Sequence, residues 1–315
     1  VRVATAVPEV RAGAVRDNLA SMLGLARDAA RQGCDVVVYP ELAITGYTCA
    51  DLFAQRLLLD AARAALMDFA EATAGLAPAF AVGLPLAVDG RLFNVAALIQ
   101  GGRVRGVVPK TYLPSSHEFY ESRWFVPGTD RVRDQVDLPG GAVPFGIDLL
   151  FRAEAPSDLC LGIEICEDLW APVPPSSLLA LAGATLLINL SASNDLAGKA
   201  DYRLELVRQQ SARCLAGYAY CSAGVGESTT DTVFGGDCIL AENGAVLARS
   251  EPFRRQAHLT IADLDMAFVQ HERQTCTSFA QAGRGGSGVA PGAYREIRLD
   301  TPRTAARHDL RRAVS

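Results

Sequence analysis

The sequence predicts an α/β protein in which a mixed β-sheet carries helices on its outer face. Short apolar runs rich in β-branched residues alternate with amphipathic helical stretches in the first half of the chain. Two hairpin signals, Gly101-Gly102 and Asn243-Gly244, join neighbouring runs, so some strands must be antiparallel. The hairpins exclude a pure βαβ repeat, and the helices exclude an all-β sandwich.

The individual elements follow from apolar periodicity and from the glycines and prolines that interrupt it. A helix is expected over 14–32, because Leu19, Met22, Leu23 and Ala26 share one face and Gly33 follows its end. Further helices are expected over 52–74, 176–182 and 201–215. Strands are expected over 2–7, 35–39, 80–86, 93–100, 104–108, 158–165, 185–189, 219–223 and 258–262, with a hairpin over 237–248.

The chain changes character from about residue 281. Glycines crowd positions 282–288, and the segment up to 315 is rich in Arg, Pro and Thr. We therefore expect one compact domain over 1–280 and a linker or connector tail over 281–315. The 50% hydrophobic content is sufficient for a large core.

Composition narrows the classes of partner. The formal net charge is −5 and long basic tracts are missing, which disfavours nucleic acid and anionic membranes. Apolar stretches such as 180–190 are too short and interrupted to span a bilayer. The eight cysteines form no C-x-x-C pair and the four histidines are scattered, so we expect no metal site. Free thiols in a reducing cytoplasm are the expected state.

Three strand-like runs end in side chains that carry chemistry. The run 161–165 ends at Cys166, the run 36–40 ends at Glu41, and the run 104–109 ends at Lys110. A thiol can act as nucleophile, a carboxylate as its base and an ammonium as a stabiliser of negative charge. Each alone also has an ordinary interpretation, as a buried cysteine, a loop carboxylate or a surface lysine. Their shared placement at strand ends favours a catalytic set.

Acidic residues flank the cysteine in sequence, at Glu164, Glu167 and Asp168. Nearby negative charge raises the pKa of a thiol, so a cation is needed beside Cys166 to favour the thiolate. Lys110 is the expected cation.

The motifs around these residues resemble the three signatures of the carbon-nitrogen hydrolase, or nitrilase, superfamily. They are Pro40-Glu41-Leu42 with Gly46-Tyr47, Pro109-Lys110-Thr-Tyr-Leu-Pro114, and Glu164-Ile-Cys166-Glu167-Asp168. Their order and wide spacing match, and the resemblance runs from Arg2 to about Phe279. Four further segments resemble the glutaminase domains of glutamine-dependent NAD synthetases, at 119–125, 167–170, 189–193 and 226–231.

The resemblance implies a catalytic mechanism. Cys166 would attack the side-chain amide of L-glutamine, and ammonia would leave through a thioester intermediate. Glu41 would transfer the proton, and Lys110 with a backbone N–H after Cys166 would stabilise the oxyanion. Glu121 resembles the second glutamate that the superfamily places near its lysine.

The resemblance also implies residues that bind the amino acid: Tyr47, Glu167, Ser193 and Lys199. The carboxylate of Glu167 suits the ammonium of free glutamine, and the ammonium of Lys199 suits its carboxylate. Ser116 is a departure, because the synthetase branch commonly carries a tyrosine there.

At the level of the whole molecule, the resemblance implies a four-layer α-β-β-α sandwich that assembles as a homo-oligomer, at least a dimer. Ammonia would pass to a second domain that uses ATP to amidate deamido-NAD to NAD. ATP and Mg²⁺ would belong to that domain, and we expect this domain to need no cofactor. The Ser-Gly-Gly-x-Asp-Ser loop of such a domain does not occur in the sequence, so we expect the synthetase in a longer chain or in a separate protein.

Two other functions remain open from the sequence. One is a free-standing amidase, carbamoylase or ω-amidase of the same superfamily, acting on another small amide. The other is a non-catalytic regulatory or assembly domain. The presence of Glu41, Lys110, Glu121 and Cys166 together argues against the second, because a scaffold alone has no physical need for all four.

Overall fold

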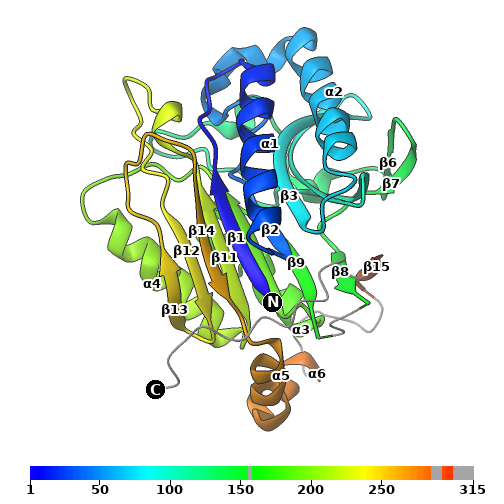
Figure 1. Ribbon diagram of the computed structural model, residues 1–315, viewed down its shortest axis with the longest axis vertical. Helices are drawn as coiled ribbons and strands as arrows, with labels where there is room; N and C mark the ends of the chain where they lie inside the picture. The colour runs from blue at the N-terminus through cyan, green and yellow to red at the C-terminus, as the bar shows by residue number, and fades with distance from the viewer. Residues whose placement is uncertain (155–157, 285–292, 301–315) are drawn as a thin grey trace.

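Two large β-sheets pack face to face in this protein. The computed structural model describes residues 1–154, 158–284 and 293–300 (Figure 1). The first sheet has the order β14-β1-β2-β3-β4-β5, and the second has the order β13-β12-β11-β10-β9-β8-β15. The first contains β1 Arg2–Val7, β2 Val36–Val38, β3 Ala79–Val88, β4 Arg91–Gln100, β5 Arg103–Pro109 and β14 His258–Asp263. The second contains β8 Leu149–Ala153, β9 Cys160–Ile165, β10 Leu186–Ser191, β11 Gly217–Ser222, β12 Cys238–Glu242, β13 Ala245–Arg249 and β15 Arg295–Leu299.

Helices cover the outer face of each sheet. Helices α1 Val15–Arg31 and α2 Arg56–Ala72 lie against the first sheet, and α3 Pro175–Leu181 and α4 Lys199–Arg213 lie against the second (Figure 1). Helices α5 Met266–Thr275 and α6 Thr277–Arg284 follow β14. Short 3₁₀ helices are η1 Tyr47–Ala54, η2 Glu121–Arg123, η3 Gly128–Asp130, η4 Cys166–Leu169 and η5 Val225–Glu227. This arrangement confirms the expected four-layer α-β-β-α sandwich.

The central strands are buried on both faces, which explains their continuous apolar runs. In β1, Val3 and Val7 pack between the two sheets, whereas Ala4 and Ala6 face the helices. The strand period of two thus divides one short sequence between two separate cores.

The expected helix over 52–74 is two elements. Helix η1 ends at Ala54, and α2 begins at Arg56 after Gln55 takes an extended conformation. A positive φ of 49° at Ala50 breaks the helical path before that point. The hairpin of β6 Gln135–Leu138 and β7 Gly141–Pro144 was not expected, because its strands are short and half of their side chains are exposed.

Beyond the domain boundary expected near residue 280, the described residues include a further strand of the second sheet. That position falls within α6, and β15 returns to the second sheet, where it pairs in parallel with β8. In β15, the outward side chains of Glu296 and Arg298 alternate with the inward side chains of Ile297 and Leu299. The polar composition of the segment concealed this alternation, which is typical of a strand. The remainder of the expected tail, 285–292 and 301–315, lies outside the described residues.

Within the described ranges, every helix is either too short or too polar to cross a lipid bilayer. The same residues contain no cluster of three His, Cys, Asp or Glu side chains suited to a metal ion.

Candidate active site

The three expected strand ends meet where the two sheets face each other. Glu41 follows β2 and Lys110 follows β5 in the first sheet, whereas Cys166 follows β9 in the second. The ammonium Nζ of Lys110 lies 2.6 Å from Oε1 of Glu41 and 2.7 Å from Oε1 of Glu121. All four side chains are buried. Folding therefore brings together four groups that are far apart along the chain.

Close backbone packing fixes the position of Glu41. Ile44 donates its N–H to the carbonyl of Gly83 on β3, and a Cβ at Gly83 would lie 2.4 Å from the nitrogen of Leu42. Glu41 itself donates its N–H to the carbonyl of Ser191 on β10, at 3.3 Å. The segment that carries the carboxylate is thus bound to both sheets.

In each of the two buried glutamates, Glu41 and Glu121, only one carboxylate oxygen accepts hydrogen bonds from the described residues. Oε1 of Glu41 accepts hydrogen bonds from Lys110 and, at 2.6 Å, from Nδ2 of Asn94. Oε1 of Glu121 accepts from Lys110 and, at 2.9 Å, from the hydroxyl of Tyr47. In the part of the chain that the structure describes, no donor reaches Oε2 of either glutamate. Buried polar atoms are nearly always paired, so a bare oxygen here is an available proton acceptor.

The electrostatics of the cluster keep the thiol protonated at rest. Burial and the charge of Glu41 raise the pKa of Cys166 to about 12, and Lys110 opposes them. Burial lowers the pKa of Lys110, but the carboxylates of Glu121 and Glu41 more than offset it and hold that pKa well above its usual value. Burial raises the pKa of Glu121 to about 7. Cys166 therefore needs a base at the moment of attack.

The backbone turns sharply at Cys166. Its φ is +45°, in the left-handed region that costs a non-glycine residue about 1–3 kcal/mol. The carboxylate of Asp168 accepts hydrogen bonds from the N–H groups of Ile165 (2.9 Å) and Tyr112 (2.8 Å), which joins the cysteine turn to the lysine segment. The turn places the sulfur at the edge of a cavity instead of inside the sheet.

That cavity has a volume of about 320 Å³ and contains three of the expected binding residues, Glu167, Ser193 and Lys199, beside Cys166. The rest of the lining is Pro114, Ser116, His117, Glu118, Phe119, Trp170 and Leu196. It therefore offers carboxylates and an ammonium within one small space.

Aromatic rings hold the ammonium of Lys199. Its Nζ lies 5.5 Å from the ring centre of Phe119 and 5.3 Å from that of Trp170, and it donates to Oδ1 of Asn194. Burial lowers its pKa. The hydroxyl of Ser193 accepts a hydrogen bond of 3.4 Å from buried Arg203, which restricts its position.

Tyr47 does not line this cavity, contrary to expectation. Its hydroxyl donates to Glu121, and its ring lines a neighbouring hollow that shares Glu118 and Phe119 as a wall. The carboxylate of Glu227 accepts the N–H of Tyr47 at 2.8 Å and fixes this position. The structure thus places Tyr47 behind the catalytic cluster, as a support for Glu121.

Sequence reasoning did not single out Asn94 and Asn189, which bond to Glu41 and Cys166, or Glu227, which holds Tyr47. Asn94 is a polar residue inside the apolar strand β4, which is itself a signal for a buried partner. Asn189 and Glu227 lie within motifs already noted, but nothing in the sequence indicates their partners.

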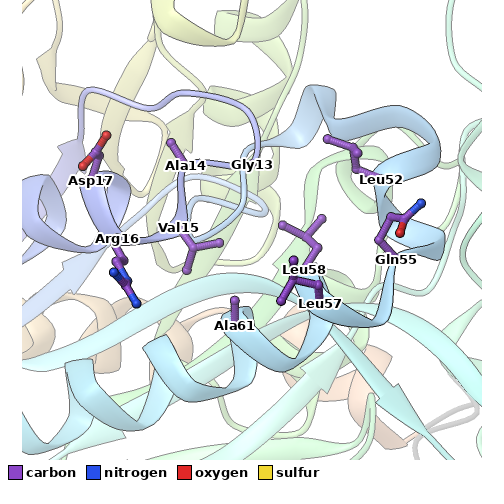
Figure 2. Close-up of a pocket in the computed structure, with 10 residues that line it drawn as sticks. All are labelled: Gly13, Ala14, Val15, Arg16, Asp17, Leu52, Gln55, Leu57, Leu58 and Ala61. Atoms are coloured by element: carbon purple, nitrogen blue, oxygen red, sulfur yellow. The ribbon is translucent and has the colours of Figure 1, made fainter.

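A larger hollow of about 510 Å³ lies away from these residues, between the start of α1 and the start of α2 (Figure 2). Its walls are mainly apolar, with Leu57, Leu58 and Ala61 on one side and Val15 on the other (Figure 2). Its lining contains no thiol, hydroxyl or lysine side chain, so the smaller cavity beside Cys166 is the candidate active site.

Known proteins resemble this chain in sequence and in fold. The family model described as "Carbon-nitrogen hydrolase" matches residues 2–274. A glutamine-dependent NAD(+) synthetase of Mycobacterium tuberculosis is 44% identical over 279 residues, which are 89% of this chain and 41% of that protein. The crystal structure of a glutamine-dependent NAD(+) synthetase from Cytophaga hutchinsonii has a TM-score of 0.75 and 27% identity, covering 84% of this chain and 43% of that one.

An amidase from Nesterenkonia sp. shares the fold over almost its whole length. Its TM-score is 0.65 at 22% identity, covering 87% of this chain and 94% of that one. The synthetases, in contrast, are more than twice as long as the part that matches, so this chain spans less than half of their length.

Proposed function

The chain belongs to the carbon-nitrogen hydrolase family, and we propose that it hydrolyses the side-chain amide of L-glutamine to glutamate and ammonia. One observation carries the proposal: Lys110 bridges two carboxylates, each with a bare oxygen, beside a buried thiol at the edge of a charged cavity. A thiol, a base and a cation in one water-poor site are the groups that amide hydrolysis through a thioester requires.

The reaction begins with proton transfer. Oε2 of Glu41 takes the proton of Cys166 as the sulfur attacks the amide carbon, because the resting thiol has a pKa of about 12. The negative charge that develops on the amide oxygen is stabilised by Lys110 and by the N–H of Glu167, in the first turn of η4 where helical N–H groups have no intrahelical acceptor.

The intermediate then collapses and is hydrolysed. Glu41 gives its proton to the nitrogen, the C–N bond breaks, and ammonia leaves a thioester on Cys166. Water loses a proton to Glu41 and attacks the thioester, and the sulfur regains a proton as glutamate is released. Glu121 holds Lys110 in place through its Oε1.

The charges in the cavity support free glutamine as the substrate. Glu167 offers a carboxylate for the α-ammonium, and Lys199 offers a cation for the α-carboxylate. Ser193 contributes a hydroxyl whose position Arg203 fixes. An amide without these charged ends would leave the polar lining unpaired, at a cost in affinity.

We also propose a use for the ammonia. The mycobacterial relative is named as a glutamine-dependent NAD(+) synthetase and is 44% identical over 279 residues. This supports delivery of ammonia to a synthetase domain that amidates deamido-NAD and that uses ATP and Mg²⁺. The glutaminase reaction itself needs no cofactor, since its nucleophile, base and cation are side chains.

We propose that this enzyme is located in the cytoplasm and that it forms a homo-oligomer. All eight cysteines are free thiols and seven of them are buried, which suits a reducing compartment. Fractionation of cells and light scattering of the purified chain would test these two points.

Measurement of glutamate released from L-glutamine tests the function. Cys166→Ala should lower the rate about 10³-fold or more, because it removes the nucleophile. Cys276→Ser is the matched control, since this cysteine lies between α5 and α6 away from the cavity, and it should retain full activity. Hydrolysis of simple aliphatic amides without hydrolysis of glutamine would favour the free-standing amidase. Unchanged hydrolysis in Cys166→Ala would contradict every catalytic proposal and favour an assembly domain.

A further inference from the structure

One side-chain amide engages both backbone polar groups of Cys166. The N–H of Cys166 donates to Oδ1 of Asn189 at 3.1 Å, and Nδ2 of Asn189 donates to the carbonyl of Cys166 at 3.5 Å. Cys166 has a φ of +45°, a conformation that persists only where surrounding contacts enforce it. Asn189 supplies such contacts from β10, the strand next to β9.

The direction of the Asn189 amide depends on Glu164, which lies opposite it in the register of β9 and β10. Oε1 of Glu164 accepts from Nδ2 of Asn189 at 3.5 Å and also from the hydroxyl of Tyr218. A carboxylate can only accept hydrogen bonds, so it selects the rotamer in which the amide nitrogen faces it. The amide oxygen then faces the N–H of Cys166.

Glu164 accepts an N–H from the first turn of α3, which helps to hold that helix, but a neutral acceptor could do the same. Glu164 is buried, and within the described ranges only neutral donors reach it: Asn189, Tyr218 and, at 2.8 Å, the N–H of Ser176. A buried carboxylate without a cation is costly, and an apolar side chain would fill a strand facing a helix at lower cost. This energetic cost is explained if the carboxylate of Glu164 orients Asn189 and thereby holds the backbone turn at Cys166.

We infer that Asn189 and Glu164 are positioning residues that hold the backbone turn of Cys166 and thereby aim its sulfur at the substrate carbon. The inference rests on the proposed role of Cys166 as nucleophile. Neither residue touches the substrate, and both act through the backbone of Cys166. A misplacement of about 1 Å is enough to lower a rate about 10²-fold, so loss of this network should reduce kcat with little change in KM.

The first test compares single variants in the full chain. Asn189→Asp keeps the acceptor for the N–H of Cys166, but it loses the donor and places a second carboxylate beside Glu164. We expect kcat for glutamine to fall about 10²-fold with KM within about threefold. Glu164→Gln should also lower kcat, because its amide can turn a donor toward Asn189. If both variants keep the wild-type kcat, the inference is wrong.

The double variant Asn189→Asp with Glu164→Gln gives the sharper result. The introduced amide can donate to the introduced carboxylate, so the hydrogen bond between the two positions returns with its polarity reversed. We expect the double variant to recover at least about tenfold in kcat over Asn189→Asp. A double variant with a kcat no better than that of the worse single variant would overturn the inference.

A matched control separates positioning from stability. Thr185 is buried just before β10, accepts the N–H of Cys160 at 3.0 Å and donates to the carbonyl of Asp158 at 2.6 Å, at the end of the strands far from Cys166. Thr185→Val should lower the melting temperature while kcat stays within about twofold. An equal loss of kcat in this control would mean that any defect between β9 and β10 disables the enzyme, which contradicts a specific role for Asn189.

Alkylation of Cys166 by iodoacetamide, followed by mass spectrometry, tests the network without an amide substrate. Asn189→Ala, which introduces no charge, should change the alkylation rate at Cys166, whereas Thr185→Val should not. If the wild-type chain hydrolyses no amide, the proposed function fails, yet this difference would still support the inference. Equal alkylation rates in wild type and Asn189→Ala would overturn it.

Discussion

A buried cluster with two carboxylates and one ammonium is the central feature at the scale of single residues. Lys110 neutralises one negative charge, and burial raises the pKa of Glu121 to about 7. Glu41 is held by Lys110 and Asn94 through one oxygen only. The cluster therefore contains one carboxylate that stabilises the lysine and one that is available to the thiol.

The raised pKa of Cys166 leads to a prediction for alkylation. Because this pKa lies near 12, the thiolate fraction should rise about tenfold with each pH unit from pH 7 to pH 9, and so should the rate with iodoacetamide. Glu41→Gln removes a negative charge that raises this pKa, so it should speed alkylation and abolish glutamine hydrolysis. Mass spectrometry of the Cys166 peptide measures the rate. A rate that is already constant at neutral pH would show a resting thiolate and remove the need for Glu41 as base.

At the scale of elements, the site depends on how closely the Glu41 segment lies on β3. A Cβ at Gly83 would lie 2.4 Å from the nitrogen of Leu42 and 2.6 Å from the oxygen of Pro40, and backbone atoms cannot move aside as a flexible side chain can. We expect Gly83→Ala to destabilise the fold by about 1–3 kcal/mol and to lower kcat, because relief of the clash displaces Glu41.

Gly24 provides the control for that substitution. It lies on the exposed side of α1 with nothing within 4 Å of an added Cβ, so Gly24→Ala should stabilise the fold by about 0.5–1 kcal/mol and leave kcat unchanged. Denaturant melts and glutaminase assays on both variants test the pair. Retention of wild-type stability and kcat in Gly83→Ala would show that this packing does not position Glu41.

The same elements show what the sequence could predict. Apolar runs that end in Glu41, Lys110 and Cys166 were sufficient to predict that these three side chains lie together, because strand ends gather at one edge of a packed sheet. The sequence could not predict that Asn189 holds Cys166, since that contact depends on the register between β9 and β10. Strand β15 was not predicted, because its charged residues conceal the alternation between outward and inward side chains in a short segment.

At the scale of the molecule, the active site belongs to neither sheet alone. Glu41 and Lys110 come from the first sheet and Cys166 from the second, and the N–H of Glu41 reaches the carbonyl of Ser191 across the two. The three groups are aligned only when the sheets pack through the core between them, which includes Val38, Ile163 and Ile165. Catalysis is therefore a property of the packed sandwich.

The last strand connects these two sheets at their far edge, where β8 and β15 lie side by side (Figure 1). Arg295 donates two hydrogen bonds to Asp148, at 2.9 and 2.8 Å, and Leu299 is buried. Beyond the strand, Gln100 of β4 exchanges two hydrogen bonds with the backbone of Asp300, at 3.1 and 2.9 Å. These contacts join β15 to the first sheet as well as to the second.

Truncation tests whether this strand is part of the folded unit. A chain ending at residue 280 loses β15, and burial of Leu299 alone is worth about 1.5–3 kcal/mol, so its melting temperature should fall by several degrees relative to a chain ending at residue 300. Arg295→Ala in the longer chain should reproduce part of that loss, because it removes the paired hydrogen bonds to Asp148 while the strand remains. Equal melting temperatures for the two truncated chains would place the end of the stable domain before β15. The lower melting temperature that we expect for the shorter chain would instead assign residues 293–300 to the domain that aligns Glu41, Lys110 and Cys166.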